Sequence, residues 1–116
     1  MRRDLERLQD ILESIAAIER YATQGRQAFD RDELIRVWMV HHIQIIGEAV
    51  AGLTDLFREK YATVPWSDII GMRNILVHEY FGIDPESVWG TVIHDLPVFK
   101  SQVSAMFDHE KSLEEP

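Results

Sequence analysis

The sequence predicts an all-α protein, an antiparallel four-helix bundle formed by one domain over residues 1–116. Apolar residues recur at three- and four-residue steps along most of the chain, which is the period of a helix buried on one face. Strict alternation of apolar and polar residues, the sign of a strand, does not persist between turn residues. Four amphipathic helices joined by short loops bury one another's apolar stripes, so a bundle is the expected arrangement.

The composition is that of a globular protein, with 46% hydrophobic and 28% charged residues. The chain has no cysteine, which excludes disulfides, thiolate metal sites and a cysteine nucleophile. A net charge of −8 disfavours sequence-independent coating of nucleic acid, although a small basic cleft remains compatible with it. We find no secretory signal and no apolar stretch of membrane-spanning length, so we expect a cytoplasmic protein without membrane contact.

The first helix is predicted from about Asp4 to Thr23, and Gly25 is a plausible stop signal. The second is predicted from Asp30, where Glu33 stands three residues after an acidic N-cap, to about Lys60. The expected buried seam of this long helix consists of Ile35, Trp38, His42, Ile45, Ala49, Leu53 and Leu56.

The third helix is predicted to open near Pro65 and to run to about Tyr80, before Gly82. The fourth starts at the run Asp84-Pro85-Glu86, which combines an N-cap acid, a proline and a first-turn acid. Its expected apolar stripe consists of Val88, Val92, Leu96, Phe99, Val103 and Met106.

Two further features of the last segment shape its prediction. Pro97 predicts a kink or a split in the fourth helix, because proline has no N–H to donate. The polar tail at about 109–116 is expected to fray. The tryptophans, at positions 38, 66 and 89, are expected to anchor the core or an interface.

Three polar residues of the second helix, His41, Gln44 and Glu48, share one helical face. This stripe is either a solvated face beside the seam or a polar face that lines a cleft or contacts a partner. A zinc site is disfavoured, because the spacing does not give two histidines four residues apart.

The octamer RNILVHEY, residues 73–80, gathers the most reactive side chains of the chain. Asn74 and His78 are four residues apart and meet on one helical face. Arg73 and His78 are separated by about 140° around a regular helix, so they diverge within one chain. If they cooperate, either the helix unwinds near His78 or a second copy in a two-fold dimer completes the site.

An arginine and a histidine favour a specific chemistry. The planar guanidinium suits a phosphodiester, and imidazole serves as a general acid or base near neutral pH. Without a metal, this pair fits attack of a ribose 2′-hydroxyl on the adjacent phosphate. By spacing alone, an arginine and a histidine near a helix end more often serve as an ion-pair donor and a boundary residue than as a catalytic pair.

The octamer matches R-N-x-x-V-H-x-Y and resembles the signature of HEPN domains. It is most similar to the R-x4-H-x-Y motif of the HepT-like toxin family. The segments WSDIIGMRNILVHEYFGID and IQIIGEA also resemble that family, and the similarity covers nearly the whole chain.

The resemblance implies a homodimer, or a higher homo-oligomer, whose composite cleft cleaves RNA without a metal or other cofactor. Arg73 and His78 are then catalytic, Asn74 supports them, and Glu48 belongs to a helix that lines the same cleft. The resemblance also implies an antitoxin partner, an MntA-like minimal nucleotidyltransferase, which transfers AMP from ATP to Tyr80. Adenylate on Tyr80 would place bulk and negative charge where an RNA phosphate binds.

Two functions therefore remain open. One is a metal-independent endoribonuclease toxin that leaves 2′,3′-cyclic phosphate ends. The alternative is a non-catalytic, nucleotide-binding or scaffold partner of a nucleotidyltransferase, which the net charge of −8 favours.

Overall fold

The computed structural model describes residues 2–71 and 84–114, and within these ranges the regular structure is all helical. Residues 66–71 form a helical segment. The remaining elements are α1 (Arg2–Ala22), α2 (Arg26–Arg31), α3 (Glu33–Ala51), α4 (Asp55–Lys60), α6 (Pro85–Gly90), the π-helical turn η1 (Thr91–Asp95) and α7 (Leu96–Glu114). The predicted all-α fold is confirmed.

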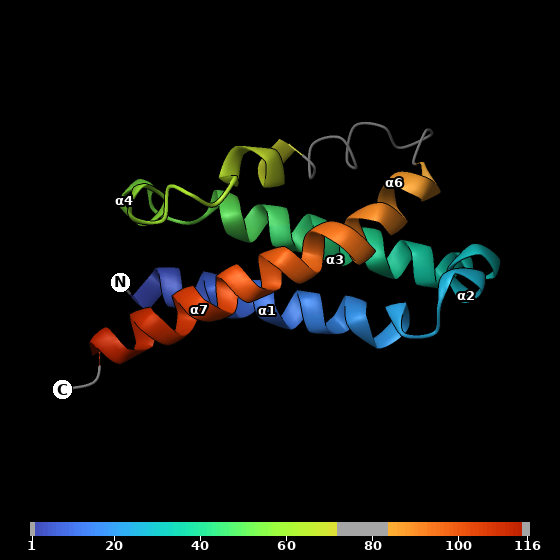
Figure 1. Ribbon diagram of the computed structural model, residues 1–116, viewed down its shortest axis with the longest axis horizontal. Coiled ribbons are helices and arrows are strands. Elements are labelled where there is room, and N and C mark those ends of the chain that lie inside the picture. Colours follow the sequence, from blue (N-terminus) through green and yellow to red (C-terminus); the bar gives the residue numbers. More distant parts are fainter. Residues whose placement is uncertain (1, 72–83, 115–116) are drawn as a thin grey trace.

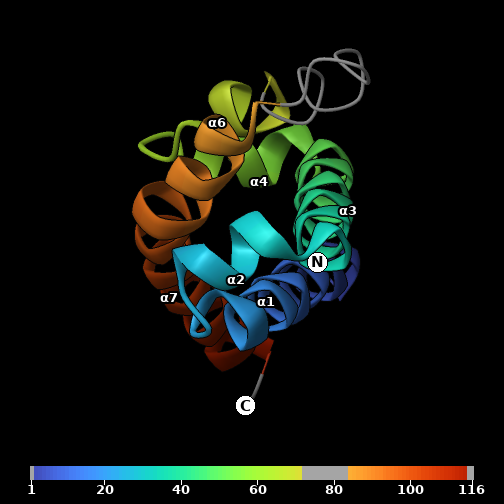
Figure 2. The same ribbon diagram turned by 90° about the vertical axis from the view of Figure 1, so that its right-hand side faces the viewer.

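The three long elements α1, α3 and α7 run along the length of the molecule, and α1 packs against both of the others (Figure 1). The chain runs outward along α1, returns along α3, and returns again from α6 to the end of α7 (Figure 1). Figure 2 looks along the bundle from the end at which α2 lies. The helices surround one apolar core, so the predicted helical bundle is present.

α1 matches its predicted range closely, and Leu8, Ile11, Ile15 and Ile18 on one face are buried. The turn that follows contains Gly25, whose φ of 90° lies in the region that favours glycine. Gly25 therefore permits the tight reversal into α2, as the stop signal in the sequence indicated.

The predicted start of the second helix is wrong by two residues. Asp30 lies inside α2, and it is Asp32 that caps α3 by accepting a hydrogen bond from the backbone N–H of Leu34 at 2.9 Å. The backbone of Asp32 is extended, which ends α2 and begins α3.

The predicted end of the second helix at Lys60 is also wrong, because the chain breaks after α3. Thr54 begins a new short helix, α4, by accepting a hydrogen bond from the N–H of Phe57. Leu53 is buried in the break as predicted, but Leu56 is 72% exposed and does not belong to the buried seam.

The last segment begins at Asp84, which caps it as predicted, and is helical from residue 85 to residue 114. All six members of the predicted apolar stripe, from Val88 to Met106, are buried. Ahead of Pro97 the helix widens into the π-helical turn η1, in which the N–H of Leu96 donates to the carbonyl of Thr91, five residues earlier. The helix then continues to Glu114, so residues 109–114 are helical where fraying was expected.

All three tryptophans make contacts between elements, but only Trp66 is buried in the core and only Trp89 packs against it, whereas Trp38 is half-buried outside it. Trp38 donates from its indole N–H to the carbonyl of Ala17 at 2.8 Å, which ties α3 to α1. Trp89 packs on Phe29, with 5.1 Å between ring centroids, and so joins α6 to α2. Trp66 is buried at the start of the helical segment 66–71.

Polar side chains close the end of the bundle at which α4 lies. The carboxylate of Glu110 on α7 accepts hydrogen bonds from Lys60 at 2.7 Å and from the hydroxyl of Tyr61 at 2.6 Å. Burial alone would raise the pKa of Glu110, but the two hydrogen bonds together with the positive charges of Lys60 and His109 lower that pKa. Burial and the same carboxylate raise the pKa of the Tyr61 phenol.

In the parts of the chain that the structure describes, no helix is long and apolar enough to cross a lipid bilayer.

Candidate functional site

Four of the predicted site residues, Arg73, Asn74, His78 and Tyr80, lie outside the described residues, as does the predicted end of the third helix. The structure describes the segments on either side of this motif and the helix that carries Glu48. The geometry of these neighbours is therefore what the structure contributes to the site.

The segment that leads into the motif is anchored by Trp66. Helical residues begin at 66, in agreement with the predicted opening near Pro65. The indole N–H of Trp66 is shared between the carbonyls of Arg58 at 3.2 Å and Tyr61 at 3.1 Å. Its ring also meets Phe99 of α7 edge-on, with 6.2 Å between centroids. The start of this segment is thus fixed to both α4 and α7.

The segment that leaves the motif is anchored at Asp84 and Glu86. The side chain of Asp84 accepts a hydrogen bond from the N–H of Glu86 and so caps α6. Both carboxylate oxygens of Glu86 accept hydrogen bonds from the guanidinium of Arg26, which ties α6 to α2. Trp66 and the Arg26–Glu86 pair thus tie the described segments that precede and follow the motif to the bundle.

α3 presents an exposed face made of four residues at helical spacing: Val37, His41, Gln44 and Glu48. Val37 is 58% exposed, His41 and Glu48 are exposed, and Gln44 is half-buried. Near its N-terminal end this face borders a groove of about 510 Å³, whose lining includes Val40, Arg36 and Pro85. The predicted polar stripe therefore lies on the surface, and the apolar side chains of Val37 and Val40 lie beside its N-terminal end.

The side chain of Glu48 forms no hydrogen bond or ion pair with another described residue. Its carboxylate is exposed on the same side of α3 as His41. The expectation that the helix of Glu48 lines the same cleft as Arg73 and His78 stays a prediction, because those two residues lie outside the described ranges.

The predicted seam of this helix is only partly right, because the buried residues of α3 are Ile35, Met39, Ile43, Ile46, Gly47, Ala49 and Val50. His42 lies on the inner side of the exposed α3 face and is half-buried. Its Nδ1 atom is 3.5 Å from the hydroxyl oxygen of Ser14 on α1, and its ring packs against Trp38. Its Nε2 atom is buried without a hydrogen-bond partner among the described residues. Burial, followed by the positive charge of neighbouring His41 and Arg20, lowers the pKa of His42. His42 is consequently a neutral packing residue at neutral pH.

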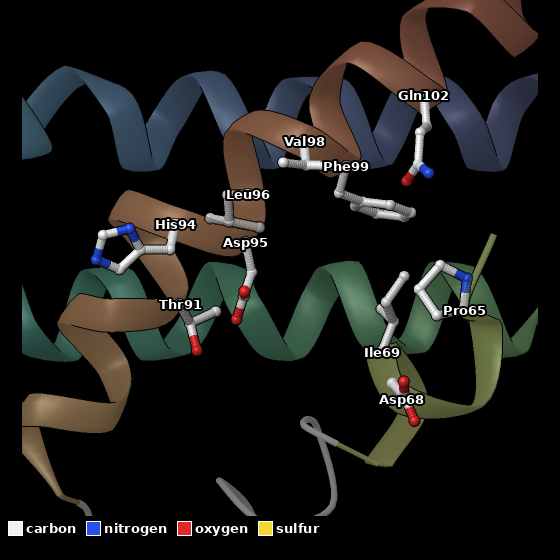
Figure 3. A pocket seen from close by; sticks show the side chains of 10 residues that line it. All are labelled: Pro65, Asp68, Ile69, Thr91, His94, Asp95, Leu96, Val98, Phe99 and Gln102. Carbon is white, nitrogen blue, oxygen red and sulfur yellow. The ribbon is translucent and has the colours of Figure 1, made fainter.

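Among the described residues, no group of three His, Asp or Glu side chains is placed to hold a metal ion. Sequence reasoning also missed a pocket of about 420 Å³ between the helical segment 66–71 and the η1–α7 junction (Figure 3). Pro97 was the one local signal for it, because it indicated an irregular helix at this position.

Comparison with known proteins places the chain in a family. The model of the family described as "Ribonuclease HepT-like" matches residues 11–106. No solved structure matches the chain significantly.

Similar curated proteins come from bacteria and archaea. "Putative RNase TTE0752" of Caldanaerobacter subterraneus subsp. tengcongensis is 39% identical, over 81% of this chain and 84% of its own length. "Putative RNase MJ1380" of Methanocaldococcus jannaschii is 39% identical, over 83% and 89%. "Probable ribonuclease HepT" of Thermococcus cleftensis is 32% identical, over 82% and 87%. The chain, a helical bundle that carries R-N-x-x-V-H-x-Y within the matched region, belongs to the HepT-like family of HEPN proteins.

Proposed function

We propose that the protein is a metal-independent endoribonuclease with a composite site formed by two copies of the chain. The observation that carries the proposal is the family match over residues 11–106, which contains the whole octamer with Arg73 and His78. The names of the similar proteins, which describe ribonucleases, support the same reaction class.

The proposed chemistry is an internal transesterification. The imidazole of His78 accepts the proton of the ribose 2′-hydroxyl, or donates a proton to the departing 5′-oxygen. The 2′-oxygen bonds to phosphorus as the bond to the 5′-oxygen breaks, which leaves a 2′,3′-cyclic phosphate and a 5′-hydroxyl. The guanidinium of Arg73 binds the phosphate and stabilises the charge that develops on its oxygens. Asn74, four residues before His78, supports the site.

The exposed α3 face supports a composite site. Val37 is 58% exposed and Leu34, also on α3, is 78% exposed, so this helix offers apolar surface outside the core of its own chain. The polar residues His41, Gln44 and Glu48 continue the same face. We propose that a second copy docks on this face, and that docking places Glu48 beside the motif as a supporting residue.

Tyr80 is the proposed point of control. It stands two residues after His78 in the octamer. Transfer of AMP from ATP to its hydroxyl, with release of pyrophosphate, would block the phosphate site by bulk and by like charge. The proposed donor enzyme is an MntA-like nucleotidyltransferase that acts as antitoxin to this toxin.

The second candidate is a non-catalytic, nucleotide-binding or scaffold partner of a nucleotidyltransferase. The net charge of −8 favours it, because RNA binding draws its affinity largely from cationic contacts to phosphates. An acidic chain needs a strong local basic site to overcome this repulsion.

The deciding experiment is RNA cleavage by the purified full chain in EDTA, with the product ends identified by mass spectrometry. We expect cyclic phosphate ends, and a loss of activity of about 10²-fold or more in Arg73→Ala and in His78→Ala. His109→Ala, which removes an exposed histidine on α7, is the matched control and should cleave normally. Equal cleavage by all of these proteins would refute the assignment, whereas a wild type that binds nucleotide and leaves RNA intact would favour the second candidate.

The role of Tyr80 has its own test. After co-expression with the nucleotidyltransferase and ATP, intact mass should show one adenylate on the wild type and none on Tyr80→Phe. An adduct that persists on Tyr80→Phe would exclude Tyr80 as the sole acceptor. Without the nucleotidyltransferase, Tyr80→Phe should cleave RNA like the wild type.

A further inference from the structure

A pocket of about 420 Å³ separates the helical segment 66–71 from the last helix (Figure 3). One wall is a stripe at three- and four-residue steps, formed by Thr91, Asp95, Val98 and Gln102. The facing wall is formed by Pro65, Asp68 and Ile69. The buried side chains of Leu96 and Phe99 form the floor of the pocket. The pocket thus joins two segments that are distant in sequence.

The pocket occurs where the last helix is irregular. Thr91 and Asp95 are the first and last residues of η1, the widened turn ahead of Pro97. Widened turns of this kind are rare and are often found at functional sites. In Figure 3 the side chain of Asp95 extends from the last helix beside Thr91, and Asp68 and Ile69 lie across from them on the segment 66–71.

The chemistry of the pocket is apolar and negative. Val98 is 61% exposed and Ile69 is half-buried, so apolar surface remains open to solvent. Asp68 and Asp95 are exposed, and neither pairs with another residue that the structure describes. Among the residues that the structure describes, no lysine or arginine lines the pocket, and the ring of His94 points away from Asp95 (Figure 3). Among the described residues, no positively charged side chain therefore neutralises the carboxylates of Asp68 and Asp95.

We propose that this pocket binds an arginine side chain of a protein partner. A guanidinium is weakly hydrated and flat, and its fork of N–H donors can serve carboxylates on two walls. The aliphatic stem of the arginine would cover Val98 and Ile69. A lysine ammonium is more strongly hydrated and gains less from an apolar floor.

Charge complementarity favours a basic polypeptide over a nucleic acid as the occupant. Asp68 and Asp95 repel the phosphates of RNA, and the net charge of −8 draws a basic partner toward the chain. This docking site is independent of the proposed ribonuclease activity, because it requires neither RNA nor the octamer.

The test is a titration of the full chain followed by methyl NMR. The probe is the peptide acetyl-Gly-Gly-Arg-Gly-Gly-amide, and the matched peptide carries citrulline, which has nearly the same shape without the charge. We expect saturable shifts of the methyl signals of Ile69, Leu96 and Val98 with the arginine peptide alone. Asp68→Asn and Asp95→Asn should each raise the Kd at least threefold. Asp108→Asn, which neutralises an exposed carboxylate on α7 outside the pocket, should leave it unchanged.

Several results would overturn the proposal. These are an absence of shifts at the three methyl-bearing residues, equal shifts with the citrulline peptide, or an equal loss of affinity in Asp108→Asn. Tighter binding of spermidine or guanosine at the same methyl groups would replace the proposed occupant by a free polyamine or a nucleobase. Failure of any kind here leaves the RNA-cleavage experiment unaffected, because no RNA is present.

Discussion

The buried carboxylate of Asp4 accepts two hydrogen bonds from Thr54, one from its backbone N–H and one from its hydroxyl, both at 2.9 Å. The Thr54 oxygen in turn accepts the N–H of Phe57 and so caps α4. One carboxylate near the start of α1 thereby fixes the helix that precedes the Trp66 anchor. The support of the candidate site depends on a contact across 50 residues of sequence.

Replacing Asp4 should loosen this end of the bundle. Asp4→Ala removes two hydrogen bonds to a charged acceptor and leaves the Thr54 N–H without its partner, so we expect a loss of about 1.5–3 kcal/mol in the free energy of unfolding. Asp10→Ala, at an exposed position of α1, should change it by less than about 0.5 kcal/mol. Urea denaturation at one fixed protein concentration measures both, because association would make stability concentration-dependent. Equal values for the two variants would show that the Asp4–Thr54 contact contributes little.

Two glycines should respond to alanine in opposite directions. Gly25 has a φ of 90°, which an alanine adopts only with strain, so Gly25→Ala should destabilise the protein by about 1 kcal/mol. Gly90 ends α6 in helical conformation, and an added Cβ would meet no atom within 4 Å. Gly90→Ala should therefore stabilise the protein by about 0.5–1 kcal/mol. Thermal unfolding of the two variants gives the signs directly, and a shared sign would contradict the argument.

His42 should make the protein less stable in mild acid. Its pKa in the folded chain is lower than the ordinary value of 6.5, chiefly because the ring is buried. Above pH 6.5 the ring is neutral in both states and has no effect. As the pH falls below 6.5, the unfolded chain takes up a proton that the folded chain resists, so stability declines down to the folded-state pKa.

The measurement is the unfolding free energy between pH 7.5 and pH 5, a window set by the ordinary histidine pKa of about 6.5. His42→Gln removes the titrating ring and should flatten the profile over this window. His94→Gln, at an exposed histidine of η1, should retain the wild-type slope. If His42→Gln and the wild type share one slope, the decline belongs to other groups.

The last helix shows what the sequence determines well. Asp84, Pro85 and the apolar stripe from Val88 to Met106 are all where they were predicted, because capping and burial periodicity are local properties. The predicted second helix shows where the apolar period in the sequence is misleading. Leu53 and Leu56 continue its period, which concealed the break at Gly52.

The break after α3 has causes that are distant in sequence. A Cβ at Gly52 would lie 2.8 Å from Nε of Arg7, so the guanidinium of this α1 residue packs directly on the backbone at the break. The new start at Thr54 is supported by Asp4. Neither contact can be read from the residues around position 52.

The candidate site and its surroundings likewise include one feature that is visible in the sequence and one that is not. The octamer consists of adjacent residues and lies within the family match, so the motif is visible in the sequence, whereas its proposed chemistry stays a prediction. The pocket between segment 66–71 and η1 was missed because it exists only when two helices meet. In sequence, Thr91, Asp95, Val98 and Gln102 look like an ordinary solvated helix face.

If the site is shared between two copies of the chain, a variant that cannot form the dimer should also lose RNA cleavage. Val37 on the α3 face is 58% exposed and Leu113 on α7 is 61% exposed, so the two residues make a matched pair. A glutamate at a buried interface is costly to desolvate, so Val37→Glu should shift the protein from dimer to monomer and remove RNA cleavage. Leu113→Glu should retain both properties. Sedimentation velocity and the cleavage assay, both at the same protein concentration, measure the two properties. A Val37→Glu monomer that still cleaves RNA would exclude a site shared between copies. A Val37→Glu protein that remains a dimer would place the interface elsewhere.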